Sequence, residues 1–342
     1  MLGKTQRDDP RLFLKAALIG IWFAASYVLL LTSTSTVAQI FFCISFAFSA
    51  AVMGFNIFHD ANHGSFSTNA RVNLILSQIS CTVLGVGRCF WCYKHNVLHH
   101  RFTSVFEWDD DIETRGHLRM SLQQPWDSKF KNQHRYFFFL YGLNTIEWVF
   151  VKDFAQYFTM RINQYQTIPA MSASEKLEFW LCKAIYLAVF VALPFFVYPA
   201  WTALAGMLLF HFILGLTLAF IFNLAHVVEK VEFPATTGSP PIIDDDWAAH
   251  QMKTTVNFGT RNRALNWFAG GLNFQIEHHL FPAISHVHYA DFGNIVSNTA
   301  AEFSLPYNNY DTYRDAVKSH WAIVRKLGTP PLAQPALAAP AT

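Results

Sequence analysis

The chain has 342 residues, a formal net charge of +2 and a composition typical of a protein that lies largely in lipid. Hydrophobic residues make up 52% of it, aromatic residues 16% and charged residues only 14%. Because a soluble domain carries about a quarter charged residues, this composition argues against a soluble globular protein. The small net charge gives no reason to expect a nucleic acid as a partner.

Four apolar stretches, at 12–31, 37–58, 179–197 and 201–222, reach the length of about 20 residues that a helix needs to cross a bilayer. The first is not typical of a cleaved signal peptide, since its apolar core is long, it has no clear cleavage site and a second stretch follows at once. The sequence therefore predicts a multi-pass integral membrane protein.

Basic residues are distributed unevenly among the segments that join these spans. The short connections at 32–36 and 198–200 contain no Lys or Arg, whereas both terminal regions and the segment 59–178 contain many. By the positive-inside rule, we expect both termini and the central segment to be cytoplasmic. Lys15 and Lys183 lie near the cytoplasmic ends of two spans, where we expect their stems to extend toward the lipid headgroups.

Two further apolar stretches, 72–86 and 136–151, are short for a membrane span. If only 136–151 crossed the bilayer, the third histidine cluster would face the opposite side from the first two, and if both stretches crossed, the first and second clusters would be separated. We therefore expect both to be interfacial or hairpin helices that lie against the membrane.

The five cysteines form an odd set without the spacing of a disulfide framework. Cys43 falls inside a predicted span, so a disulfide scaffold is not expected. The motif Cys89-Phe-Trp-Cys92 has no βαβ context that would support a redox role. We interpret both of its cysteines as packing residues.

Eight histidines occur at positions where they can meet at one end of the molecule. They form the clusters His59-Asp-Ala-Asn-His63, His95-Asn-Val-Leu-His99-His100 and His278-His279, with His226 alone just after the fourth span. Residues four apart lie on one face of a helix, and imidazole is the commonest metal-binding side chain. So many histidines exceed what one ion uses, so the pattern predicts two metals. The simpler alternative is that some of them are hydrogen-bonded polar residues at the membrane interface.

Imidazole ligands alone leave the metal open, since they suit iron, zinc, copper or nickel. The setting favours redox chemistry, because the site lies level with the headgroups, is within reach of a lipid-soluble substrate and has no hydrolytic nucleophile motif beside it.

The three clusters resemble the histidine boxes of the membrane fatty acid desaturases. The third box, Gln275-Ile-Glu-His278-His279-Leu-Phe-Pro, begins with glutamine and is similar to that of the front-end Δ5/Δ6 branch and its bacterial relatives. The segments Trp247-Ala-Ala-His250-Gln and Leu224-Ala-His226-Val-Val-Glu are similar as well. The resemblance runs from about residue 15 to residue 295.

This resemblance implies an all-α integral membrane protein, with four transmembrane helices in two hairpins under a cytosolic helical cap that holds a dinuclear metal site. The corresponding domain is expected over 12–328, between a cytosolic tail at 1–11 and a Pro- and Ala-rich tail at 329–342 that is expected to be disordered. Two iron ions are the implied cofactors. The implied ligands are His59, His63, His95, His99, His100, His226, His278 and His279, with Gln275 at the position where other branches have a histidine.

The family's reaction uses O₂ and two electrons to introduce a cis double bond into a fatty acyl chain, here linked to a lipid, CoA or a carrier protein. Many front-end members carry a fused cytochrome b5 domain with a His-Pro-Gly-Gly motif, which this sequence lacks. We therefore expect a separate electron donor, such as a ferredoxin, a rubredoxin or a free cytochrome b5.

Hydrogen-bond acceptors behind the ligands are needed to fix the imidazole tautomers. The candidates are Asp60 and Glu277 inside the boxes, the run Asp109-Asp110-Asp111 after the second box, and His250, which could also contact substrate. For the acidic run, a solvated loop is the alternative. His211, in the middle of the fourth span, is expected to hydrogen-bond between helices, and His117, His134, His286, His288 and His320 are expected to be surface or packing residues.

Other functions compatible with parts of the pattern are fatty acyl hydroxylation on the same scaffold and, less well, metal transport or sensing. Transport needs polar ligands through the membrane interior, and the spans contain only His211. A zinc-dependent lipid hydrolase needs about three ligands, fewer than the pattern offers.

Overall fold

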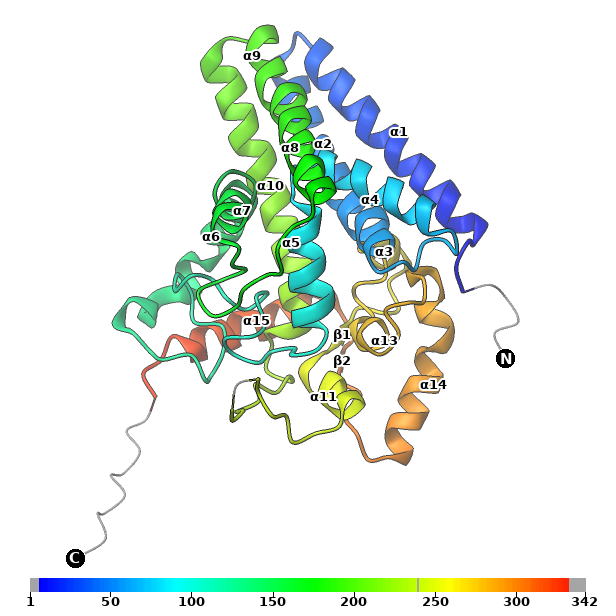
Figure 1. Ribbon diagram of the computed structural model, residues 1–342, viewed down its shortest axis with the longest axis vertical. Helices are drawn as coiled ribbons and strands as arrows, with labels where there is room; N and C mark the ends of the chain where they lie inside the picture. Colours follow the sequence, from blue (N-terminus) through cyan, green and yellow to red (C-terminus); the bar gives the residue numbers. More distant parts are fainter. Residues whose placement is uncertain (1–5, 239, 332–342) are drawn as a thin grey trace, which may run out of the picture.

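The computed structural model describes residues 6–238 and 240–331, and their regular structure is almost entirely helical (Figure 1). The helices of the membrane half and its attachments are α1 (Pro10–Thr32), α2 (Thr36–Met53), η1 (Gly54–Phe58), α3 (His59–Asn62), α4 (Ala70–Leu84), α5 (Arg88–Cys92), η2 (Tyr93–His99), η3 (Ser128–Asn132), α6 (Gln133–Glu147), η4 (Trp148–Lys152), α7 (Asp153–Thr159), α8 (Ala173–Tyr186), η5 (Leu187–Ala192), α9 (Leu193–Val197) and α10 (Ala200–His226). The remaining elements are α11 (Trp247–Thr254), β1 (Asn257–Phe258), α12 (Arg263–Phe268), α13 (Gln275–Leu280), η6 (His286–His288), α14 (Tyr289–Glu302), β2 (Asn309–Tyr310) and α15 (Tyr313–Leu327).

In the described residues, four helices have the length and hydropathy of membrane spans: Pro10–Thr32, Thr36–Asn62, Ala173–Val197 and Ala200–His226. They coincide with the four predicted spans and extend each by a few residues. The extensions have local causes. Asp9 caps the first span with Pro10 at its first turn, and Ser172 forms a capping box with Glu175 at the start of the third.

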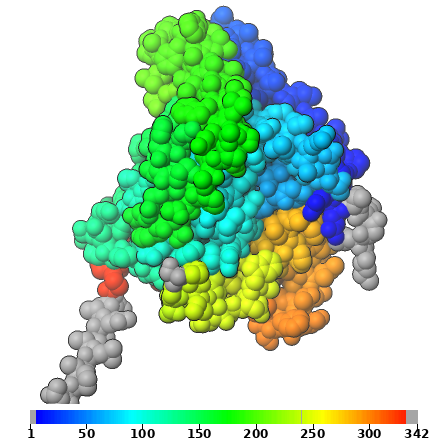
Figure 2. Space-filling model, in the orientation of Figure 1, coloured from blue at the N-terminus to red at the C-terminus, as the bar shows by residue number. Residues whose placement is uncertain are grey.

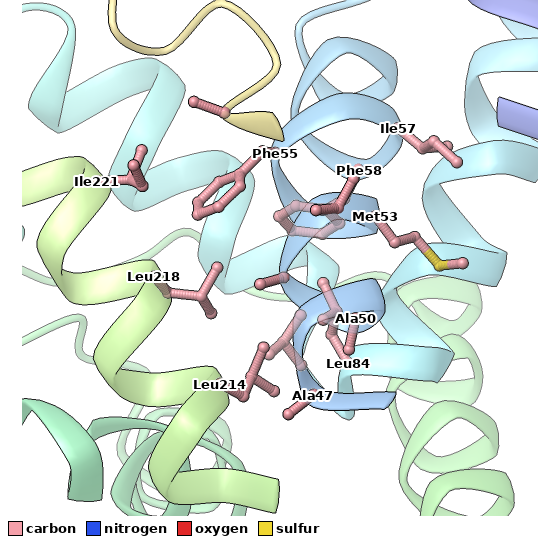
Figure 3. Packing of buried hydrophobic residues seen from close by; sticks show 14 of the residues in the cluster. Ala47, Ala50, Met53, Phe55, Ile57, Phe58, Leu84, Leu214, Leu218 and Ile221 are labelled. Carbon is pink, nitrogen blue, oxygen red and sulfur yellow. The ribbon is translucent and has the colours of Figure 1, made fainter. Parts of the chain in front are cut away.

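The spans pack around the second one, which is the most buried of them. Figure 3 shows Ala47 and Ala50 of α2 facing Leu214 and Leu218 of α10, with Phe55 of η1 above them. Small residues allow the two backbones to approach closely. This core joins the two spans that carry His59 and His226 near their ends.

The stretch 72–86 becomes α4, which is followed by α5 after a bend of 110°. By length and composition this pair is either a fifth, broken span or a re-entrant loop. The chain just before α4 and just after α5 meets again, since the rings of His59 and His95 are 5.2 Å apart. The pair thus returns to the end of the molecule from which it departs.

The stretch 136–151 becomes α6 and η4, and α6 lies along α10. Gly142 and Gly215 face each other at this contact, where a Cβ on Gly215 would lie 2.7 Å from the carbonyl oxygen of Tyr141. His211 of α10 bonds to Thr145 of α6 (3.1 Å) and to Tyr186 of α8 (3.0 Å). The predicted interhelical role of His211 is confirmed.

The prediction that Lys15 and Lys183 extend toward the lipid headgroups was wrong. Lys15 is 8% exposed and Lys183 is 1% exposed, and both point into the protein. Their ammonium groups find polar partners inside instead of in the headgroup layer.

The two short span connections lie at one end of the molecule, and α11, α13, α14 and α15 form a cap at the other (Figure 1). In Figure 2 the segments around α11 and α14 form the surface of that end. The cap also contains a short parallel pair, β1 and β2, with Asn257 opposite Asn309, which an all-α prediction does not include. The C-terminal tail predicted to be disordered falls mainly on residues 332–342, outside the described residues, as do residues 1–5 of the predicted N-terminal tail.

Candidate metal centre

The eight clustered histidines meet at the junction between the spans and the cap, in overlapping groups of which two together hold seven of them. The first group is His59, His63, His95 and His278, and the second group is His99, His226 and His279. Within each group the ring nitrogens lie within 4.8 Å of one another. His100 lies between the groups, with its ring centre 4.7 Å from that of His278 and 4.4 Å from that of His279.

Two π-helical segments bring the first two boxes to this point. The span that contains α2 passes through η1 directly before His59, and α5 passes through η2, which contains His95 and His99. A π-helical turn widens the helix by one residue and therefore rotates the following side chains, and such turns are frequent at functional sites. Hydropathy and four-residue spacing do not reveal these turns.

The third box and the lone histidine come from the cap side and from the last span. His278 and His279 are consecutive on the short helix α13, so they point in different directions and reach different groups. His226 is the last residue of α10. Each group therefore combines side chains from three separate parts of the chain.

Seven of these histidines present a buried ring nitrogen that has no hydrogen-bond partner among the described residues. Such atoms are rare in folded proteins, because an unpaired buried polar group carries a desolvation penalty. They are the Nε2 atoms of His59, His63, His95, His99, His278 and His279, and both ring nitrogens of His100. Their convergence fits a site that binds metal ions.

The opposite nitrogens of several rings are held by hydrogen bonds. His99 Nδ1 lies 2.9 Å from Asp109 Oδ1, His279 Nδ1 lies 2.7 Å from Gln251 Oε1, and His278 Nδ1 lies 3.1 Å from the Tyr289 hydroxyl. An acceptor at Nδ1 fixes the tautomer that leaves Nε2 unprotonated toward a metal.

Burial also favours the neutral imidazole that metal binding requires. It lowers the pKa of His278 and of His279 well below the usual histidine value, and the neighbouring histidines lower both further. Neutral rings with converging Nε2 atoms can donate lone pairs to cations at neutral pH.

Comparison with known proteins bears on what this centre does. Residues 35–311 match the family model described as fatty acid desaturase. This chain belongs to the fatty acid desaturase family.

Several relatives resemble the desaturase over nearly its whole length. The sn-1 linoleoyl-lipid 6-desaturase of Synechocystis sp. is 34% identical over 330 residues, which cover 95% of this chain and 91% of the relative. The acyl-lipid (8-3)-desaturase of Physcomitrium patens is 36% identical over 324 residues, 93% of this chain and 67% of the relative. A protein of the same name from Mortierella alpina is 31% identical over 317 residues, 92% and 70%. The desaturase is therefore an oxidoreductase that desaturates fatty acyl chains.

Gln275 of the desaturase lies beside the second group. Its amide nitrogen is 2.9 Å from His226 Nε2, and its Oε1 atom is buried without a partner among the described residues. The His226 Nδ1 atom faces the Thr254 carbonyl oxygen at 3.4 Å. Gln275 thus contacts a clustered histidine and also offers an oxygen toward the interior.

Asp60 and Glu277 make their hydrogen bonds away from the clustered histidines. Asp60 binds His286 Nδ1 (2.8 Å) and Ser285 (3.1 Å), and its distance to His59 Nδ1 is 3.9 Å. Glu277 is fully buried and binds Asn257 (2.8 Å) and Tyr307 (2.5 Å), which lie behind α13.

The acidic run after the second box divides into three different environments. Asp109 is bound to His99, while Asp110 accepts from Lys152 at 2.8 Å. An Asp111 oxygen lies 3.5 Å from His95 Nδ1, and its other oxygen accepts from Lys94 at 2.7 Å. Asp109 and Asp110 are buried, so the run as a whole is not a solvated loop.

His250 is buried, and its Nε2 atom has no hydrogen-bond partner in the part of the chain that the structure describes, but it belongs to neither group. The next residue, Gln251, is the one that contacts His279. Sequence reasoning missed Gln251 and Tyr289 as partners of the clustered histidines, because glutamine and tyrosine far from the boxes carry no local signal. His286 and His320, expected at the surface or in packing, are both buried and hydrogen-bonded.

Proposed function

We propose that the desaturase acts on an acyl chain of a membrane lipid, uses two iron ions held by the clustered histidines, and receives electrons from a separate protein. The observation that carries the metal proposal is the convergence of seven histidines with unpaired buried nitrogens. The lipid-linked substrate is supported by the names of the similar proteins, which include a linoleoyl-lipid 6-desaturase and acyl-lipid (8-3)-desaturases.

The two groups suggest how the ligands divide. His59, His63, His95 and His278 would hold one ion, and His99, His226 and His279 the other. Both ring nitrogens of His100 lack a hydrogen-bond partner among the described residues, and His100 would bind whichever ion one of them reaches. Gln275 would offer its buried Oε1 atom as an additional donor to that ion, and its amide, now 2.9 Å from His226 Nε2, would have to release that nitrogen for His226 to bind.

Iron bound there would supply the oxidising chemistry with O₂, for which histidine ligands are suited. In the overall reaction, –CH₂–CH₂– and O₂ with two electrons and two protons give –CH=CH– and two waters. The protein's own part is to orient the imidazoles through Asp109, Gln251 and Tyr289 and to keep the centre dry. Seven of the eight clustered histidines are at most 8% exposed, so bulk water is excluded from the groups.

For the membrane orientation, we propose that both termini, the cap and the metal centre are cytoplasmic. The support is that the uncharged short connections lie at the end opposite the cap, while the basic residues belong to segments at the cap end. A cytoplasmic centre would be accessible to a soluble electron donor.

The test is a lipid and fatty-acid profile of host cells that express the protein, with double-bond positions located by mass spectrometry. We expect a new double bond in a lipid-linked chain, and its loss in His278→Ala. His117→Ala, a change at an exposed histidine outside both groups, serves as the matched control and should keep the product. A hydroxylated acyl chain as the product would contradict desaturation and would indicate that the protein is a hydroxylase. Metal uptake by the cells without any change in lipids would favour transport.

A further inference from the structure

A buried lysine on the third span binds the backbone of other elements. The Lys183 ammonium donates to the Gly85 carbonyl oxygen (2.6 Å), to the Val149 carbonyl oxygen (2.8 Å) and to Asp153 Oδ2 (2.8 Å). Lys183 is 1% exposed and Asp153 is completely buried. All three N–H donors of the lysine are therefore used, and none reaches solvent.

The pair contacts the bend between α4 and α5 on both sides. Gly85 is the C-cap residue that follows α4, and Lys183 binds its carbonyl oxygen. Gly87 precedes α5, and its N–H donates to the same Asp153 oxygen at 2.7 Å. Helix ends leave backbone groups without partners inside the helix, so one ion pair satisfies a group at the end of α4 and another at the start of α5.

Other residues of the third span follow the same bend closely. Gly85 has a φ of +70°, and a Cβ there would lie 2.8 Å from the Tyr186 ring. The Cys182 thiol faces the carbonyl oxygens of Cys81 (3.4 Å) and Val86 (3.5 Å). The inward face of α8 thus follows the bend along about one helical turn, from Cys182 to Tyr186.

The bend determines where the second box lies. α5 continues without interruption into η2, which contains His95 and His99, and His100 follows at once. A change in the angle between α4 and α5 would move these three rings relative to His59 and His63, which precede α4.

We propose that Lys183 and Asp153 are positioning residues that set the place of the second histidine box by holding the α4–α5 bend against the third span. This inference rests on the proposed metal centre. An ion pair is an expensive way to gain stability alone, because desolvation offsets much of its attraction and a hydrophobic pair often serves as well. A geometric role explains why both charges are directed at backbone groups of one bend.

Displacement of the second box should affect the two groups unequally. The first group would keep His59, His63 and His278 without His95, whereas the second group would keep only His226 and His279 without His99. In Lys183→Met we therefore expect the second ion to bind at least about tenfold more weakly, as when a group that orients a ligand is removed. The first ion should be retained with a smaller loss.

The experiment uses the full-length protein in detergent or nanodiscs, titrated with Fe(II) and, for its visible spectrum, with Co(II). Lys183→Met is compared with wild type for metals bound per chain, affinity and the Co(II) absorption bands, which report ligand geometry. Asp153→Asn is the second variant. It keeps the size and an oxygen acceptor, and it should change the same spectrum in the same direction even if Lys183→Met does not fold.

The matched control is the double variant Arg88→Met with Glu178→Leu. This pair also joins the bend to α8, at 2.5 Å between Arg88 Nε and Glu178 Oε1, but both side chains are more than one-fifth exposed and neither binds the bend's backbone. It should keep both ions and the wild-type Co(II) spectrum.

The outcomes separate this inference from the proposed function. If wild type binds two ions and both Lys183→Met and Asp153→Asn do so with unchanged affinity and spectrum, the positioning role is overturned. A lower unfolding temperature with an unchanged spectrum of the loaded protein would also overturn it, because the pair would then only stabilise the fold. If wild type itself binds no metal, the proposed metal centre fails first.

Discussion

The two histidine groups differ in how the Nδ1 atoms of their rings, on the side opposite Nε2, are held. In the second group two of the three have an acceptor at normal distance, Asp109 for His99 and Gln251 for His279, and His226 faces the Thr254 carbonyl oxygen at 3.4 Å. In the first group, His278 alone has one, the Tyr289 hydroxyl, at normal hydrogen-bond distance among the described residues. The acceptors come from the segment after the second box and from the cap.

The first group is held mainly by packing. The Trp91 ring stacks on His95 at 4.4 Å between centres, and it also contacts His59 and His63. Carboxylate oxygens lie farther away, at 3.5 Å from His95 Nδ1 and 3.9 Å from His59 Nδ1. The comparison indicates that the second group depends on individual hydrogen bonds, and that the first depends on the continuity of its helices.

Among the substitutions that test this difference, Asp109→Ala should have the largest effect on metal binding. Among the described residues, it removes the only carboxylate hydrogen-bonded to a clustered histidine, and also the acceptor for the Ser104 N–H (2.7 Å). Loss of such an acceptor typically weakens metal binding about 10–100-fold. We expect one of two irons to be lost on gel filtration, with turnover falling in parallel. Asp244→Ala, at an exposed carboxylate, should keep both, and full iron content in Asp109→Ala would contradict the dependence of the second group on this bond.

A smaller effect is expected from Gln251→Ala. The Gln251 amide accepts from His279 (2.7 Å) and Thr103 (2.9 Å) and donates to the His100 carbonyl oxygen (3.1 Å). We expect about tenfold weaker binding of the same iron. Gln251→Glu keeps the acceptor oxygen and should recover most of the affinity in a metal titration. Equal losses in the two variants would mean that the amide donor, and not the acceptor for His279, is the part that matters.

Tyr289→Phe should change the first group only slightly. The substitution removes a 3.1 Å hydrogen bond to His278 but keeps the buried ring. One neutral hydrogen bond contributes about 0.5–1.5 kcal/mol, so the first iron should bind only a few-fold more weakly. A loss as large as that of Asp109→Ala would show that the two groups depend on hydrogen bonds equally.

The membrane half of the fold and the meeting of the histidines were predictable from the sequence. Hydropathy locates the four spans, because a helix needs about 20 apolar residues to cross the hydrocarbon core of a bilayer. Four-residue spacing places His59 beside His63, and the parity of the spans places the boxes at one end. Family resemblance adds the expected pairing of the boxes with His226.

The rest depends on tertiary contacts that leave no local pattern. The partners of His279 and His278, Gln251 and Tyr289, are recognisable only once the cap is folded over the spans. The same is true of Lys183, whose position near the end of a span suggested an extended side chain, although the end of α4, η4 and α7 surround it with acceptors. Hydropathy reports how much lipid a residue can meet and does not report which helix covers it.

Asp60→Asn should have the smallest effect on metal binding, despite the place of Asp60 inside the first box. Asp60 accepts from His286 (2.8 Å), whose other nitrogen faces the buried Lys15 ammonium (3.1 Å), so its contacts join the box to the first span. Both irons should be retained, while the free energy of unfolding falls by about 1–3 kcal/mol, because a buried charged acceptor is replaced by a weaker one. Lys15→Met should lower the stability in the same way, and its effect should not add fully to that of Asp60→Asn, since the two residues share one chain of hydrogen bonds. Loss of an iron in Asp60→Asn with unchanged stability would instead place Asp60 among the groups that orient His59, and the first group would then also depend on a carboxylate.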